Sequence, residues 1–166
     1  THLIKSVMDG IDREKSIASM HVCRGNWSKD ESILLTGPYT PLLDLFADIN
    51  ADLLALEFST PRAGELKSLL ADERIKNKII LGLGVLNPRF DQKEDVDFIY
   101  NRAKEALTYI DKENLWLNPD CGFATFSNRP VNEYENIRAK VGSMIEARDR
   151  LRADYEWWYK LFFQIL

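Results

Sequence analysis

Strand-like and helix-like hydrophobic patterns alternate along this chain, and the alternation constrains the fold more than any other feature. Residues 78–85 (KIILGLGV) are apolar almost without interruption, which is typical of a strand buried on both faces of a parallel sheet. Residues 95–110 instead space their apolar side chains three and four positions apart, as an amphipathic helix does. Four strand–helix pairs of this kind predict an α/β fold with a parallel sheet, and ligands at the carboxyl ends of its strands.

The pattern places each element approximately. We expect strands at residues 16–23, 52–58, 78–85 and 115–117, and helices at residues 2–12, 42–49, 65–73, 95–110 and from about 132 onward. Residues 24–41 contain glycines and prolines and predict a long loop. A complete (β/α)8 barrel takes about 250 residues. Four parallel β/α units in 166 residues therefore predict about half of a TIM-like barrel, with the helices outside.

Composition excludes several classes of function. The chain is 45% hydrophobic and 29% charged, which is typical of a globular domain. Its net charge is −4 and no cluster of lysine and arginine stands out, so we expect no nucleic-acid partner. No apolar run approaches the ~20 residues that cross a bilayer, and the N-terminus lacks the pattern of a secretion signal. Two distant cysteines make no disulfide framework, and we expect a cytoplasmic location without membrane contact.

Side chains with metal-binding chemistry stand at the ends of three predicted strands. His21 and Cys23 are two residues apart on one strand and therefore point to the same side. Cys121 follows another strand, and Glu57 ends a third between apolar neighbours, where a buried charge is costly without a cation or partner. Imidazole, thiolate and carboxylate groups are zinc ligands. The sequence therefore predicts that these four residues bind one Zn²⁺ ion.

Each candidate ligand also has a plainer interpretation. A His-x-Cys pair is usually accidental, and a lone cysteine is often a small buried apolar residue, so separate structural roles remain an alternative. Two thiolates and one carboxylate on Zn²⁺ would leave the centre with a net charge of −1. Such a centre acidifies water poorly but suits a substrate thiol held as a nucleophilic thiolate, which indicates alkyl transfer to sulfur. Glu57, the hardest ligand on zinc, is the one we expect to loosen.

The segments His21-Val-Cys23 and Pro119-Asp-Cys121-Gly122, with the isolated Glu57, resemble the zinc signature of cobalamin-independent methionine synthase. The resemblance covers about residues 15–152 and is strongest to short homologues that consist of the catalytic barrel alone. It implies zinc and methyl transfer to homocysteine. The implied donor is a methylated folate or, in some short relatives, a methylcorrinoid protein.

We accordingly divide the chain into residues 1–152, the zinc-bearing C-terminal half of such a barrel, and residues 153–166, an aromatic-rich helical tail. Tyr155, Trp158 and Phe162 share one helical face of this tail. We expect the tail to pack on the core or on another copy of the chain, because it lacks the basic face of a membrane-surface anchor.

The chain departs from the family pattern in two ways. The family's proton-donating histidine follows the Gly-x-Gly strand, but residues 82–89 (GLGVLNPR) contain none, so no catalytic residue is assigned. The family's homocysteine and folate contacts come largely from the first half of the barrel, which this chain does not contain. The alternatives are a non-catalytic half-barrel that needs a partner or the other half, and a barrel of the uroporphyrinogen decarboxylase type. That decarboxylation needs no such ligand set.

Polar residues beside the candidate ligands are candidates for substrate contact. Arg24, Asn26 and Arg62 are able to meet a carboxylate or an amine, and Asp120 is able to orient a ligand or contact the substrate. Hydrogen bonding within loops is the plainer role for Arg24, Asn26 and Arg62, and capping of the following turn is the plainer role for Asp120. The Gly-x-Gly pair at residues 82–84 indicates close approach between segments at the barrel mouth.

Overall fold

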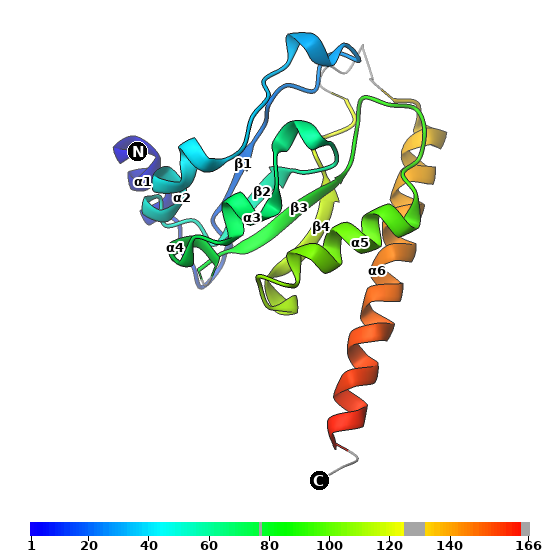
Figure 1. The fold of residues 1–166 in the computed structure, drawn as a ribbon. Coiled ribbons are helices and arrows are strands. Elements are labelled where there is room, and N and C mark those ends of the chain that lie inside the picture. Colours follow the sequence, from blue (N-terminus) through cyan, green and yellow to red (C-terminus); the bar gives the residue numbers. More distant parts are fainter. Residues whose placement is uncertain (77, 125–131, 164–166) are drawn as a thin grey trace.

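A single parallel sheet organises the fold of the computed structural model, which describes residues 1–76, 78–124 and 132–163. Its strand order is β1-β2-β3-β4, the same as the order along the chain (Figure 1). Parallel neighbours need crossover connections, and helices and loops make each crossover. The α/β class and the four parallel strands predicted from the sequence are confirmed. The strands are β1 (Ser19–Val22), β2 (Leu53–Glu57), β3 (Ile80–Leu86) and β4 (Leu115–Pro119).

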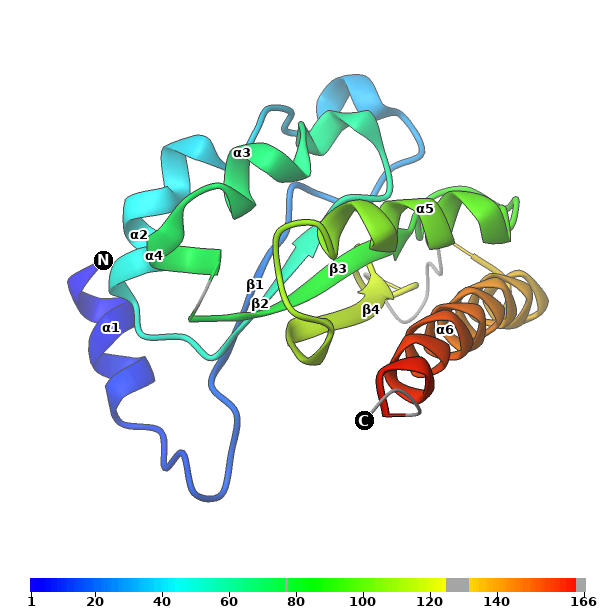
Figure 2. The same ribbon diagram turned by 60° about the horizontal axis from the view of Figure 1, so that its bottom comes forward.

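Helices α2 to α5 lie along one face of this sheet (Figure 2). The α-helices are α1 (His2–Asp9), α2 (Leu43–Asp48), α3 (Leu66–Leu70), α4 (Glu73–Lys76), α5 (Val96–Ala106) and α6 (Tyr134–Phe163). Short 3-10 helices occupy Glu31–Ile33, Thr40–Leu42, Pro61–Ala63 and Lys112–Asn114. Two of these interrupt the segment that the sequence predicted as a long loop at residues 24–41.

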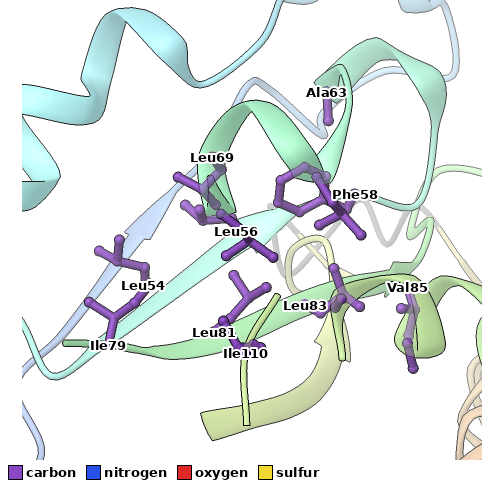
Figure 3. Close-up of a cluster of buried hydrophobic side chains, with 14 of the residues drawn as sticks. Leu54, Leu56, Phe58, Ala63, Leu69, Ile79, Leu81, Leu83, Val85 and Ile110 are labelled. Atoms are coloured by element: carbon purple, nitrogen blue, oxygen red, sulfur yellow. The ribbon is translucent and has the colours of Figure 1, made fainter. Parts of the chain in front are cut away.

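The hydrophobic core fills the space between the sheet and these helices (Figure 3). Alternate residues of β2, Leu54 and Leu56, point into it together with Leu81 and Leu83 of β3, and all four are 0% exposed. Burying each such side chain stabilises the fold by about 1.5–3 kcal/mol. Because side chains alternate along a strand, the intervening residues of β2, including Glu57, face the opposite side of the sheet.

The structure differs from the expected elements where polar side chains bind the backbone. The helix predicted at residues 65–73 ends at Leu70, and a separate helix, α4, begins at Glu73, where the Asp72 carboxylate accepts a hydrogen bond from the Arg74 backbone N–H at 2.9 Å. β1 begins at Ser19 rather than residue 16, because strand pairing with β2 starts there. The helix expected at residues 95–110 starts as predicted, capped by the Asp95 side chain, and ends at Ala106.

The long helix α6 packs beside α5 and extends beyond the sheet (Figure 1). Lys140 anchors it: its side chain is 0% exposed and pairs with Glu94 at 3.0 Å. α6 runs without a break through the predicted domain boundary at residues 152 and 153. The side chains from residue 156 onward lie outside the described residues, so the packing of the aromatic tail stays a prediction. Within the described part of the chain, every helix is too short or too polar to cross a bilayer.

Candidate metal centre

Four side chains converge at the carboxyl ends of β1, β2 and β4. One potential ligand atom from each of His21, Cys23, Glu57 and Cys121 lies within 4.8 Å of the corresponding atoms of the other three. Glu57 is buried, Cys121 is half-buried, and the other two are exposed. The sequence separates the two cysteines by 98 positions, and the fold brings their Sγ atoms to 3.2 Å.

The His21 imidazole is held in one tautomer by the sheet. Its Nδ1 lies 2.8 Å from the backbone oxygen of Ala55, its register partner on β2. A carbonyl oxygen only accepts hydrogen bonds, so Nδ1 carries a proton, and in the neutral ring the lone pair is then on Nε2. Nε2 faces the Cys121 Sγ at 3.0 Å. The ring therefore presents its ligating nitrogen to the cluster, as metal-binding histidines do.

Partial desolvation by the surrounding side chains raises the pKa of both thiols in the metal-free protein. For Cys23 and for Cys121 it is the largest cause, and the nearby Glu57 carboxylate raises both pKa values further. The backbone N–H of Gly25 donates to the Cys23 Sγ at 3.2 Å and acts in the opposite direction. A metal ion would have to displace the thiol protons, because the thiolate is the ligand.

Glu57 is 1% exposed and has hydrogen-bond donors on both carboxylate oxygens. Its Oε1 accepts from the Arg24 backbone N–H at 3.1 Å and from the Asn26 Nδ2 at 2.5 Å. Its Oε2 pairs with the Arg62 Nη2 at 3.1 Å in a buried ion pair. Arg62 is thus a partner for the buried charge, so the burial of Glu57 does not by itself require a cation. Oε1 still lies 3.5 Å from the Cys121 Sγ.

Asp120 joins the end of β4 to the end of β2 and so places Cys121. Its Oδ1 accepts hydrogen bonds from the Phe58 and Ser59 backbone N–H groups, both at 3.0 Å, and its Oδ2 accepts from the Ser59 hydroxyl at 2.5 Å. Burial raises the pKa of Asp120 to about 6, although these hydrogen bonds act in the opposite direction. The link crosses β3 at Gly84, where a Cβ atom would meet the Asp120 Oδ1 and lie 2.6 Å from a β2 backbone oxygen.

This donor set fits a zinc ion. Imidazole nitrogen, thiolate sulfur and carboxylate oxygen are its usual ligands, and they number four here. His21 and Glu57 also have the hydrogen-bonded outer partners that orient ligands in metal sites. The convergence of the four side chains is a feature of the structure, and their binding of zinc stays a prediction.

The residues predicted to contact substrate are all bonded within the protein, and Arg24, Asn26 and Asp120 are buried. Arg24 donates to the backbone oxygen of Arg62 at 3.1 Å and its guanidinium lies 3.9 Å from the centre of the Tyr39 ring. Asn26 and Asp120 are 3% and 1% exposed. Their substrate-binding role stays a prediction, and their visible role is to support the cluster.

Two further residues near the cluster were not predicted. The Tyr39 hydroxyl accepts from the Glu57 backbone N–H at 2.9 Å. Arg89, after β3, donates to the Asn26 Oδ1 at 3.0 Å. The only sequence signal for Arg89 is its position just beyond the carboxyl end of a predicted strand.

A hollow of about 500 Å³ opens beside the cluster on the face of the sheet opposite α2 to α5. The cluster residues His21 and Cys121 form part of its wall. Small residues at matched positions of the central strands, Ala55 and Gly82, leave this space open. The other residues lining it are Ile17, Ser19, Leu53, Trp116, Leu117, Asn118, Pro119, Asp120 and Gly122.

Residues 11–149 match the family model described as "Cobalamin-independent synthase, Catalytic domain". A Bacillus subtilis protein, YxjG, is 31% identical over 145 residues, which are 86% of this chain and 37% of that protein. The 5-methyltetrahydropteroyltriglutamate--homocysteine methyltransferase of Xylella fastidiosa strain M23 is 30% identical over 117 residues, which are 70% of this chain and 14% of that enzyme.

Solved structures show the same fold. The B12-independent methionine synthase from Shewanella sp. W3-18-1, in complex with selenomethionine, matches with a TM-score of 0.72 and 18% identity, over 91% of this chain and 42% of that chain. The putative vitamin-B12 independent methionine synthase from Listeria monocytogenes matches with a TM-score of 0.56 and 22% identity, over 87% of this chain and 39% of that chain. The four-stranded sheet is thus part of a TIM-like barrel, and the chain spans well under half of these relatives' length.

Proposed function

Because this chain belongs to the family of cobalamin-independent synthase catalytic domains, we propose that it carries the zinc-binding part of a methyltransferase site. The observation that carries the proposal is the convergence of His21, Cys23, Glu57 and Cys121 within 4.8 Å. When bound there, zinc would hold a substrate thiol as a nucleophilic thiolate at neutral pH. The family match gives no support to the alternative of a uroporphyrinogen decarboxylase-type barrel.

The proposed reaction is methyl transfer from a methylated folate to homocysteine, giving methionine. The homocysteine sulfur loses its proton and forms the new carbon–sulfur bond, while the donor's carbon–nitrogen bond breaks and that nitrogen takes up a proton. The name of the Xylella relative, which includes both a methylated pteroyltriglutamate and homocysteine, supports these substrates. A methylcorrinoid protein is the alternative donor.

The chain's own residues prepare the ligands for this chemistry. Ala55 fixes the tautomer of His21, and Asp120 places Cys121 beside Glu57. Arg62 pairs with the Glu57 Oε2, whereas Oε1 lies toward Cys121, so the carboxylate would keep a charged partner whether or not it bound a metal ion. The proposal includes a cytoplasmic location, because a reducing compartment keeps two sulfurs 3.2 Å apart as thiols.

A second candidate is a metal-binding half-barrel that turns over only with further segments. The observation that favours it is coverage: the chain spans 37% of the YxjG protein and 42% of the Shewanella structure. The hollow beside the cluster is open on the face that a closed barrel would enclose. We therefore expect the isolated chain to bind zinc without catalysing methyl transfer.

Elemental analysis tests the metal centre. We expect about one zinc per chain in the purified wild type, loss of zinc in Cys121→Ala, and retention in the control His2→Ala, which removes the histidine outside the cluster. X-ray absorption at the zinc edge should then show sulfur neighbours from Cys23 and Cys121. Wild-type protein that neither contains zinc nor takes it up would refute the site. Methyl transfer by the isolated chain would refute the second candidate.

A further inference from the structure

We propose that Arg89 is a positioning residue for the metal centre and acts on it through the side-chain amide of Asn26. Arg89 follows β3, the strand of the sheet that contributes no predicted ligand. The inference rests on the proposed function, because it takes the four-residue cluster as a zinc site.

The Arg89 guanidinium is buried and makes polar contacts with two side chains, besides lying 5.4 Å from the centre of the Phe90 ring. It is 0% exposed, its Nε donates to the Asn26 Oδ1 at 3.0 Å, and its Nη2 forms an ion pair with Glu31. Its Nη1 has no hydrogen-bond partner among the described residues. Burying a guanidinium is costly unless it is paired, so these two contacts fix its position. The Arg89 backbone N–H also donates to the Asn87 Oδ1 at 3.0 Å, which fixes the turn after β3.

The guanidinium decides which way the Asn26 amide points. A guanidinium donates hydrogen bonds and accepts none, so the Asn26 atom that faces Arg89 must be the amide oxygen. The amide nitrogen is then directed to the opposite side. There it donates to the Glu57 Oε1 at 2.5 Å and lies 3.8 Å from the Cys23 Sγ.

The opposite orientation would work against the metal centre. It would place the amide oxygen of Asn26 against a carboxylate oxygen and a thiolate, both of which are acceptors. In the observed orientation, a single amide group contacts two of the predicted ligands, Glu57 and Cys23. Loss of outer partners of this kind typically lowers metal affinity by about 10- to 100-fold. Arg89 is thus linked to the ligands through one intermediate residue.

A double-mutant cycle tests this linkage in the full chain. Arg89→Met keeps the length of the side chain without its donors, and Asn26→Ala removes the amide. Zinc dissociation constants come from competition with a chromophoric chelator, and the thiolate-to-metal charge-transfer band of the Co²⁺-loaded protein reports on the sulfur ligands. We expect each single variant to weaken zinc binding about 10- to 100-fold and to shift the band. The zinc dissociation constant of the double variant should lie within about twofold of that of the weaker-binding single variant, because both substitutions break the same linkage.

Two further variants separate positioning from folding. Glu31→Gln removes the charge of the ion pair but keeps an oxygen that accepts from the Arg89 Nη2, so Arg89 stays in place beside Asn26 and we expect zinc binding within about twofold of wild type. Arg89→Lys keeps the charge beside Glu31 but lacks the planar fork that reaches Asn26, and it should lose affinity as Arg89→Met does. Circular dichroism of the metal-free variants checks that the fold is retained.

The outcomes distinguish this inference from the proposed function. Three results would overturn the positioning role while leaving the zinc site intact. They are additive losses of zinc affinity in the double-mutant cycle, wild-type zinc affinity in either Arg89 variant, and an unshifted charge-transfer band in the Co²⁺-loaded variants. Wild-type protein that binds no zinc would instead overturn the zinc site, and the inference with it.

Discussion

Replacing Asp120 by asparagine should change how the stability of the metal-free protein depends on pH. The side chain is 1% exposed, and burial raises its pKa from 3.8 to about 6. Because this folded-state pKa lies above the unfolded one, the folded protein binds the proton more tightly, and stability falls as pH rises from about 4 to about 6. The raised pKa corresponds to a penalty of about 3 kcal/mol at pH 7.

Urea unfolding of chelator-treated protein measures this penalty. Asparagine does not titrate, so the unfolding free energy of wild type relative to Asp120→Asn should increase by about 2 kcal/mol as the pH is lowered from about 7 to about 4, and by the rest of the penalty of about 3 kcal/mol below pH 4. Asp30→Asn is the control: hydrogen bonds from Ser32 lower the pKa of Asp30, so its contribution is constant over this range and is lost only at lower pH. A pH-independent difference for Asp120 would refute the reasoning, because the hydrogen bonds from Ser59 and the neighbouring backbone would then outweigh burial.

Three further predictions concern the cluster and its supports. Zinc binding should tighten by up to about 100-fold per pH unit between about pH 6 and 8, measured by chelator competition, because Cys23 and Cys121 have raised pKa values and each must lose a proton; a pH-independent affinity would exclude both thiols as ligands. Gly84→Ala should lower the free energy of unfolding, measured in urea, by about 1–3 kcal/mol, because its methyl group would lie 2.6 Å from a β2 backbone oxygen and against Asp120. Unchanged stability would mean that these neighbours move aside without cost. Arg62→Met should cost the chelator-treated protein about 3–5 kcal/mol, because it leaves Glu57 buried and unpaired. Added zinc should restore part of that loss, and a failure to do so would contradict Glu57 as a ligand.

The sheet was predictable from the sequence because its strands differ sharply from its helices. Residues 78–85 are apolar on both faces, as a strand of a parallel sheet must be when both of its faces are buried. The structure places β3 at this segment. The break between α3 and α4 was not predictable in the same way. An aspartate such as Asp72 also fits the exposed face of one continuous helix, so its presence does not predict a break. It caps α4 in the structure because the chain turns at that point.

The candidate ligands were predictable from chemistry and position, but their supports were not. Strand ends of a parallel sheet lie at one edge, so residues following three strands were expected to meet. The partner of each loop side chain depends on the path of the loop, which no periodicity specifies. Arg62 was a candidate for substrate contact, yet it binds Glu57 five positions away. Arg89 contacts Asn26 across 63 positions of sequence, and no local pattern indicates that pair.

The ligand-bearing strands are not all neighbours, and this has a consequence for function. β3 lies between β2 and β4, so Cys121 reaches the other ligands across β3. Two features permit this: Gly84 of β3 has no side chain, and Asp120 forms hydrogen bonds to the end of β2. Among the described residues, the contacts that assemble the cluster come from this chain's own sheet and loops. The hollow beside the cluster, in contrast, is bounded by one face of four strands and is open opposite them. Metal binding and substrate binding thus depend on different parts of a barrel, and a chain with this arrangement should retain the first without the second.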